Sequence, residues 1–153
     1  MKTIYSDFKN LFKYNDWANE RVLGSFNTAA NLEEKPRLLF SHILISQTIW
    51  LERILGQAQT FKTTMQMLSL DDCKTLLLQS TKDWLSFVET IDAEKSNSII
   101  NYKDTKGNDH QNHLSDILTH VINHSSDHRG QIALLIRNSG GTPAVTDYIA
   151  YCR

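Results

Sequence analysis

The sequence predicts an all-α fold, a single-domain helical bundle, and three observations lead to this prediction. Four segments place apolar residues three or four positions apart, which is the spacing of one face of an α-helix. Glycine (6) and proline (2) are scarce, so the chain has few of the residues that form tight turns. Hydrophobic residues make up 41% of the chain and charged residues 22%, which is typical of a folded globular protein.

The first two predicted helices occupy the N-terminal third of the chain, whose 153 residues fit one domain over positions 1–153. The first helix runs from Tyr5 to Phe26, with Asp7 near its start, where a carboxylate complements the helix dipole. The second begins near Pro36, a residue tolerated in a first turn, and ends at Gly56, a typical stop signal.

The middle of the chain combines a loop, a third helix and an extended segment. The stretch from Gln57 to Ser69 is polar and rich in threonine, which predicts a loop. Its final serine forms a capping pair with Asp72, and the third helix then runs to about Ile91. Residues 98–113 alternate unevenly around Gly107, so we expect a short irregular hairpin or an extended crossover there.

A long fourth helix follows this segment. It begins near His113 to Ser115, contains Gly130, and ends at the pair Gly140 and Gly141. The tail after Pro143, with the sequence VTDYIAYCR, has room for one short helix.

Charge and cysteine content exclude several classes of protein. The formal net charge is −1 and no block of lysine or arginine stands out, so nucleic acid is not an expected partner. No apolar run reaches about 18 residues, and the start MKTIYSDFKN is polar where a signal peptide has its apolar core. We therefore expect a cytoplasmic protein with no membrane partner. Cys73 and Cys152 lie outside any metal-site spacing and are interpreted as structural thiols.

Three histidines recur at intervals of four in the predicted fourth helix, at His120, His124 and His128. Imidazoles four residues apart lie one turn apart on the same face, so two of them can share one metal ion. On a helical wheel, His124 and His128 fall about 20° either side of the apolar residue Ile117, whereas His120 falls about 60° away. His120 is therefore the weakest candidate ligand of the three.

A fourth histidine, His42, lies on the inward stripe of the second predicted helix together with Leu38, Ser46, Ile49 and Arg53. A single inward histidine is most often a core residue that is hydrogen-bonded, and the HxxxH spacing also occurs on exposed or merely packed helix faces. Three buried imidazoles each need a polar partner, and one shared metal ion satisfies all of them. The candidate metal ligands are therefore His42, His124 and His128.

The remaining polar residues near this stripe have weaker cases. Asn15, Asn19 and Gln131 fall where they could line a pocket, although such residues also satisfy buried backbone groups. Asp127 could orient an imidazole, but a solvated position is the commoner role for an aspartate on a helix. None of these residues is an evident general base, and His110 and His113, in the expected hairpin, are interpreted as solvated and are assigned no role.

Several segments resemble the DinB/YfiT-like family. The strongest resemblance is HVINHSSDHRGQIALLIRNSGG, from His120, followed by PAVTDYIAY. YNDWAN, at residues 14–19, and LFSHILISQTIWLERI, at residues 39–54, resemble the first two helices of that family, so the resemblance covers nearly the whole chain.

The resemblance implies a four-helix bundle in the order up-down-down-up, a long crossover between the second and third helices, and often a homodimer. It also implies a three-histidine metal site, in which the helix-two histidine matches His42 and the pair ahead of RGQ matches His124 and His128. His120 fits a recurrent position that is not a ligand. The family includes thiol-dependent transferases, presumed hydrolases and many members without an assigned reaction, and its link to DNA damage does not imply DNA binding.

A three-histidine site leaves at least one coordination position open, which is the pattern of catalytic rather than structural metal sites. Such an ion lowers the pKa of bound water or of a small-molecule thiol. We therefore expect one divalent ion, zinc or nickel. We also expect a metal-dependent thiol transferase or hydrolase that acts on a small molecule, with thiols of low molecular weight among the candidate substrates. The alternatives are a non-catalytic metal-binding or stress-response regulatory protein and a bundle that binds no metal.

The second predicted helix is apolar on two sides. Phe40, Leu44, Leu51 and Leu55 lie roughly opposite His42 on the helical wheel. A second subunit could cover this face in a homodimer, which the family resemblance favours. The third helix or the long loop could instead cover it within one chain.

Overall fold

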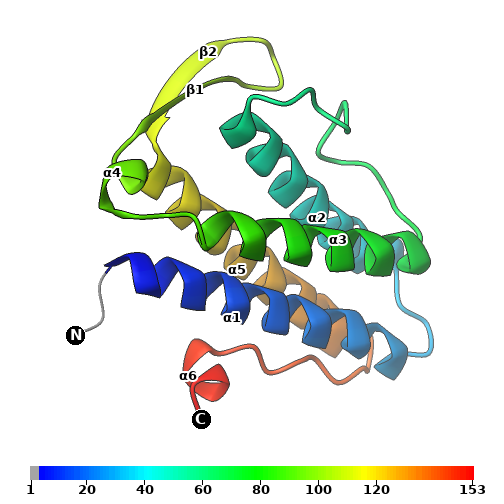
Figure 1. The fold of residues 1–153 in the computed structure, drawn as a ribbon. Helices are drawn as coiled ribbons and strands as arrows, with labels where there is room; N and C mark the ends of the chain where they lie inside the picture. Colours follow the sequence, from blue (N-terminus) through cyan, green and yellow to red (C-terminus); the bar gives the residue numbers. More distant parts are fainter. Residues whose placement is uncertain (1–3) are drawn as a thin grey trace.

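The computed structural model describes residues 4–153, with side chains from residue 7 onward, as four long helices packed into a bundle (Figure 1). The long helices are α1 (Ile4–Ser25), α2 (Glu34–Leu55), α3 (Leu70–Val88) and α5 (Leu114–Asn138). Three short helices and two strands complete the fold: η1 (Phe26–Thr28), α4 (Ala93–Ser96), β1 (Ile99–Lys103), β2 (Asp109–His113) and α6 (Tyr148–Tyr151).

The order of directions in the bundle is up-down-down-up, as the family resemblance implies. Ser41 and Gln47 of α2 contact residues progressively further along α3, so α2 and α3 are parallel. Arg129 of α5 bonds Asn15 of α1, and Ile136 packs near Val22, so α1 and α5 are parallel and run opposite to the other pair. The loop between α2 and α3 crosses the length of the bundle, which is what allows two consecutive helices to be parallel (Figure 1).

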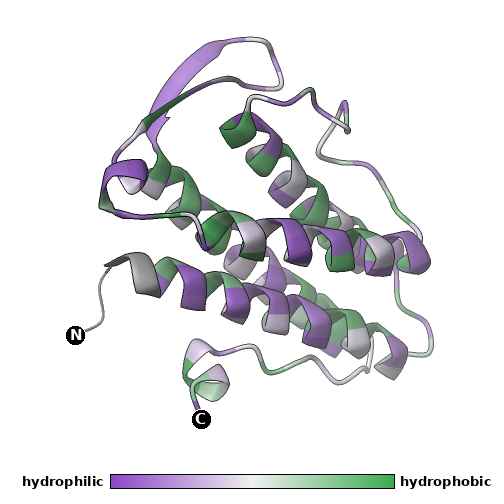
Figure 2. Ribbon diagram, in the orientation of Figure 1, coloured by the Kyte–Doolittle hydropathy of each residue, from purple (hydrophilic) through white to green (hydrophobic). Residues whose placement is uncertain are grey.

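The core forms where the apolar stripes of all four long helices meet (Figure 2). At one end Phe12 of α1 stacks on Trp84 of α3, with ring centroids 4.5 Å apart. At the other end Phe40 and Leu44 of α2 pack with residues of α1, α3 and α5. This burial is the main force that holds the helices together, because each removes its apolar face from water.

The extended segment is a two-stranded antiparallel hairpin that precedes α5, so the hairpin alternative is correct, although its register is regular and not irregular as predicted. Tyr102 of β1 pairs with His110 of β2, and Gly107 supplies the turn with a φ of 86° that other residues rarely adopt. The ring of Tyr102 packs against that of Trp50, with centroids 5.0 Å apart, so the hairpin is fastened to α2.

The third helix is shorter than the sequence predicted, since it ends at Val88 and not near Ile91. A separate short helix, α4, begins after Asp92, whose side chain accepts a hydrogen bond from the backbone N–H of Lys95. The new N-cap restarts the helix in a different direction, and the helical periodicity of the sequence does not register that change.

The second apolar face of α2 lies inside the chain, so the predicted subunit contact at that face is wrong. Phe40 and Leu44 are fully buried and Leu51 is nearly so, against residues of α1, α3 and α5. The alternative, that another helix of the same chain covers this face, is correct. Only Leu55, the last residue of the helix, remains exposed.

By length and hydropathy alone α2 could cross a membrane. However, 61% of its most apolar 18-residue stretch is buried within the bundle, as is typical of a helix in a protein core. The apolar residues of α2 are accounted for by its packing against α3, α5 and β1.

Candidate metal centre

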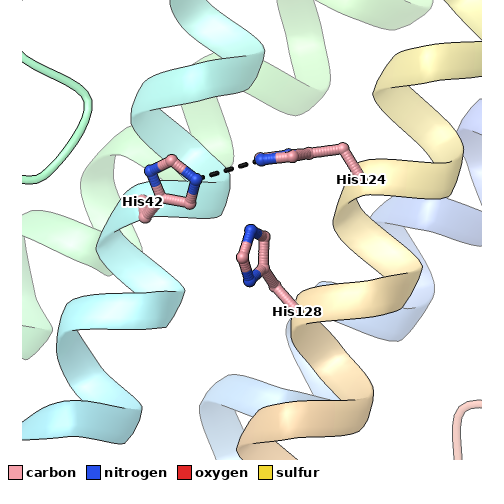
Figure 3. A group of neighbouring side chains, drawn as sticks. All are labelled: His42, His124 and His128. Atoms are coloured by element: carbon pink, nitrogen blue, oxygen red, sulfur yellow. Dashed lines mark hydrogen bonds between the residues drawn. The ribbon is translucent and has the colours of Figure 1, made fainter.

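Three histidine side chains from two helices meet on one side of the bundle. His42 projects from α2, and His124 and His128 project from α5, so that one ring nitrogen of each lies within 4.8 Å of the others (Figure 3). The Nε2 atoms of His42 and His124 are 3.0 Å apart. The structure thus brings together the three residues that the sequence selected and draws them from the two neighbouring antiparallel helices α2 and α5.

Hydrogen bonds fix which nitrogen of each ring faces the centre of the cluster. Nδ1 of His42 lies 2.9 Å from the carbonyl oxygen of Thr64, in the loop between α2 and α3. A carbonyl only accepts, so this Nδ1 carries the proton and the Nε2 of neutral His42 has a free lone pair. Nδ1 of His128 likewise donates to Oε1 of Gln131 at 3.2 Å, which leaves Nε2 of neutral His128 as an acceptor.

Burial disfavours the charged forms of His42 and His124. It lowers the pKa of His42, against the opposing hydrogen bond to Thr64. It also lowers the pKa of His124 to about 4, with further contributions from the positive charges that His128 and His42 would carry. Neutral imidazole is the form that binds metal, so the site favours the protonation state that a metal ion needs.

The donor set fits a divalent ion better than it fits a hydrogen-bonded pair. One hydrogen bond between His42 and His124 would leave Nε2 of His128 without a partner among the described residues. Tetrahedral coordination at the usual metal–nitrogen distance separates ligand nitrogens by about 3.3 Å, which falls between the 3.0 Å pair and the 4.8 Å limit of the group.

His120 lies one turn before His124 but outside the group of ligand atoms, in agreement with its weak position on the wheel. Its ring is 5.6 Å from that of His124 and packs edge-on to Trp50 at 5.2 Å. The hairpin residues His110 and His113 are exposed and bond Asp104 and the carbonyl of Asn97, away from the cluster.

Asn15 and Asn19 do not line the site, contrary to the prediction, because both are fully buried between the helices. Their amide groups donate to Oε1 of Gln47 at 2.8 and 3.1 Å, and their oxygens accept from Arg129 at 2.7 and 2.9 Å. Gln47 also bonds Ser80 and Ser125, so side chains of all four long helices share one polar network.

This network was not predicted from the sequence, although one signal for it exists. Gln47 lies in the most apolar helix of the chain, where a polar residue needs an internal partner. The network also contains the guanidinium of Arg129, which is 2% exposed and directly follows His128 in the chain. It therefore fixes the rotation of α5 and, with it, the direction of His124 and His128.

Of the other candidate residues, Gln131 contacts the cluster and Asp127 does not. Gln131 is exposed but orients His128, whereas Asp127 is exposed and has no hydrogen bond to any ligand ring, as its solvated interpretation implied. Asp16, beside the network on α1, is buried, and burial raises the pKa of its carboxyl group to about 7. Cys73 is buried and Cys152 exposed, and both are free thiols.

A hollow of about 610 Å³ lies between α2 and α3 and is lined by residues such as Leu51, Glu52 and Trp84. It contains none of the three histidines, because it opens on the other side of α2. Its lining includes the carboxylates of Glu52 and Asp83 but no histidine or cysteine, and the group of described residues that could hold a metal ion is the three histidines.

Comparisons with known proteins agree with this architecture. The model of the DinB family matches residues 2–153. The protein named DinB from Bacillus subtilis (strain 168) is 26% identical over 170 residues, which cover 95% of this chain and 94% of that protein. The crystal structure of a DinB-like protein from Bacillus cereus ATCC 10987 superposes with a TM-score of 0.70 at 15% identity, over 90% of this chain and 94% of that one, and shows the same fold.

Proposed function

This chain belongs to the DinB family, and we propose that His42, His124 and His128 hold one divalent metal ion, zinc or nickel, at which a small molecule reacts. The observation that carries this proposal is the convergence of three ring nitrogens, with the rings of His42 and His128 held by hydrogen bonds on the side away from the cluster. Metal-ligating histidines are commonly oriented in this way by a carbonyl or carboxylate. An all-imidazole donor set suits zinc and nickel equally, so the ligands alone do not choose between them.

The reaction class that this site supports best is thiol transfer or hydrolysis. A divalent ion held by three imidazoles supplies an open position that lowers the pKa of water or of a thiol. The protein's own contribution is to favour the neutral rings of His42 and His124, through burial, and to hold His42 and His128 through Thr64 and Gln131. The cluster is partly exposed, which gives a small molecule access to it.

The test is turnover of two substrate types by protein with and without metal. Protein stripped by a chelator and reloaded with zinc or nickel should conjugate a small thiol to an electrophile, or hydrolyse an ester or amide, and the stripped protein should not. Metal uptake without turnover on any of these substrates would point to the non-catalytic metal-binding or regulatory alternative. Absence of both uptake and turnover would contradict the proposal as a whole.

We also infer a homodimer, as the family resemblance suggested, and a cytoplasmic location, which is inferred from the hydropathy of the sequence and not from the family. The buried face of α2 is excluded as the contact, so a dimer must use another surface.

A further inference from the structure

Arg53 carries a positive charge, forms no salt bridge among the described residues, and lies on the same stripe of α2 as His42. The guanidinium of Arg53, on α2, sits over the ring of Trp50 at 4.7 Å and over that of Tyr102 at 5.4 Å. We propose that this guanidinium binds an oxyanion, a carboxylate or a phosphate, on the small molecule whose reacting end lies at the three histidines. The inference rests on the proposed function and specifies the class of substrate.

Arg53 has unused capacity to bind an anion. Its Nε is buried without a hydrogen-bond partner, and no side chain from residue 7 onward forms a salt bridge with it. A guanidinium has five N–H groups in a planar fork that matches a carboxylate or phosphate. A buried donor left without a partner is unfavourable, so an oxyanion arriving from solvent would relieve that cost.

The acidic groups that surround Arg53 are engaged elsewhere. The carboxylate of Asp104 accepts hydrogen bonds from the side chains of Asn108 and His110 and from two backbone N–H groups of the hairpin turn. Asp109 pairs with Lys103. Asp116 faces the hollow beside His120 and makes no bond with Arg53. The guanidinium of Arg53 therefore forms no salt bridge with these carboxylates, although Asp104 lines the same hollow and is near enough to act on it electrostatically.

Two hollows that meet at Tyr102 provide room for a ligand. The first, of about 470 Å³, is lined by Arg53 and by the turn and first strand of the hairpin. The second, of about 250 Å³, is lined by Trp50, Tyr102, Asp116 and His120, among others. The rings of Trp50 and Tyr102 offer flat apolar surfaces there, and the first hollow has the size of a small-molecule site.

The two ends of the proposed site lie on the same side of α2, with Trp50 and His120 between them. Arg53 and His42 lie on the same stripe of α2, eleven residues apart, which is about 16 Å along the axis. Helical side chains lean toward the N-terminus, so the guanidinium approaches the cluster to within roughly 10–15 Å. His120 fills the interval, with its ring 5.6 Å from His124 and 5.2 Å from Trp50.

This spacing specifies the shape of the molecule. Its oxyanion must lie about as far from the reacting atom as the two ends of a tripeptide lie from each other, because an extended chain covers about 3.5 Å per residue. A molecule with the oxyanion only two or three bonds from the reacting atom cannot reach both ends at once. The inferred class is an elongated small molecule with a carboxylate or phosphate at the far end.

A purely structural role for Arg53, fastening the hairpin to α2, makes a different prediction. It predicts that replacing Arg53 weakens the fold without any effect of anions. The chain contains a matched control, because Arg21 sits over the ring of Trp17 at 4.9 Å but already donates to the carbonyl of Val145. Arg21→Met removes the same kind of stacked cation from the contact between α1 and the C-terminal tail, away from the proposed site.

The direct test is an NMR titration of zinc-loaded full-length protein with glutarate and with inorganic phosphate. The Nε–H signal of Arg53 and the indole N–H of Trp50 should shift and saturate, and Arg53→Met should weaken binding at least tenfold, the lower end for a charge-assisted hydrogen bond of about 1.5–3 kcal/mol. Arg53→Lys should keep part of the affinity and Arg21→Met all of it. Shifts that are absent, or equally strong in Arg53→Met, would overturn the proposal.

Repeating the titration without zinc separates this inference from the proposed function. If the protein takes up no metal but the anions still bind at Arg53, the metal proposal fails and the anion site stands. For the span, the affinity of zinc-loaded protein for the tripeptide glutathione should fall at least tenfold in Arg53→Met, and that for 2-mercaptoethanol should not. Equal effects on the two thiols would overturn the inferred length of the molecule.

Discussion

At the scale of single residues, the histidines and their neighbours show how burial sets protonation. Burial lowers the pKa of His42 and His124, which favours the neutral rings needed at the site. The same physical effect raises the pKa of Asp16 to about 7, because a buried carboxylate loses its hydration. The first consequence serves the site, whereas the second costs stability at neutral pH.

Asp16 should make the fold less stable as pH rises from about 4 to about 7. The ordinary pKa is 3.8 and the folded value is about 7, so in this window the folded state binds a proton that the unfolded state does not. The contribution of Asp16 to the free energy of unfolding therefore falls as pH rises, by up to a few kcal/mol at about 1.4 kcal/mol per pH unit. Urea unfolding of the wild type and of Asp16→Asn at several pH values measures the difference, which should grow in favour of Asp16→Asn toward pH 7. Asp127→Asn, at an exposed site, is the control, and parallel curves for wild type and Asp16→Asn would refute the assignment.

At the scale of elements, the polar network around Gln47 connects the four long helices beneath the metal site. One side chain bonds Asn15, Asn19, Ser80 and Ser125. These bonds lie in the apolar interior, where a lost partner is not replaced by water. The network therefore specifies how α1, α2, α3 and α5 are rotated relative to one another.

Replacing Gln47 with alanine should lower the free energy of unfolding by about 2–4 kcal/mol, because several buried amide and hydroxyl groups lose their partner. It should also weaken zinc binding, since α5 would lose the bonds that fix its rotation. Gln79→Ala, at an exposed position of α3, should change stability by no more than about 0.5 kcal/mol. Thermal and urea unfolding measure the first effect and calorimetric zinc titration the second. A Gln47→Ala protein as stable as Gln79→Ala would show that the network is dispensable.

Sequence periodicity predicted what is local and missed what depends on packing. The four helices and the inward direction of His42, His124 and His128 follow from positions along single helices, and the structure places them accordingly. The pairing of Asn15 with Gln47 joins residues 32 positions apart, and no spacing within one helix encodes it. The restart at Asp92 was missed because a change of helix direction leaves the apolar pattern nearly unchanged.

At the scale of the whole molecule, the face of α2 that includes Phe40 and Leu44 shows the same limit. An apolar face in a sequence indicates that something covers it but not which element does so. In the structure the other helices of the same chain cover this face, and Leu44 is fully buried. The inferred homodimer therefore cannot depend on these residues.

Replacing Leu44 with alanine should destabilise the chain by about 2–5 kcal/mol, as cavity-forming substitutions in cores do. It should leave the oligomeric state of the folded protein unchanged. Light scattering at micromolar concentration and urea unfolding measure the two effects. Leu55→Ala, at the exposed end of the same face, is the matched control and should do neither. A folded monomer produced by Leu44→Ala from a dimeric wild type would show that this face is an interface after all.

The central claim is that three particular histidines hold one metal ion, and metal content measures it most directly. Protein purified without chelators, and each alanine variant of His42, His124, His128 and His120, would be analysed for zinc and nickel after saturation and desalting. We predict about one ion per chain in the wild type, strong loss in the first three variants, and retention in His120→Ala, whose ring lies outside the ligand group. No ion in the wild type, or a loss in His120→Ala as large as that in His124→Ala, would contradict the account.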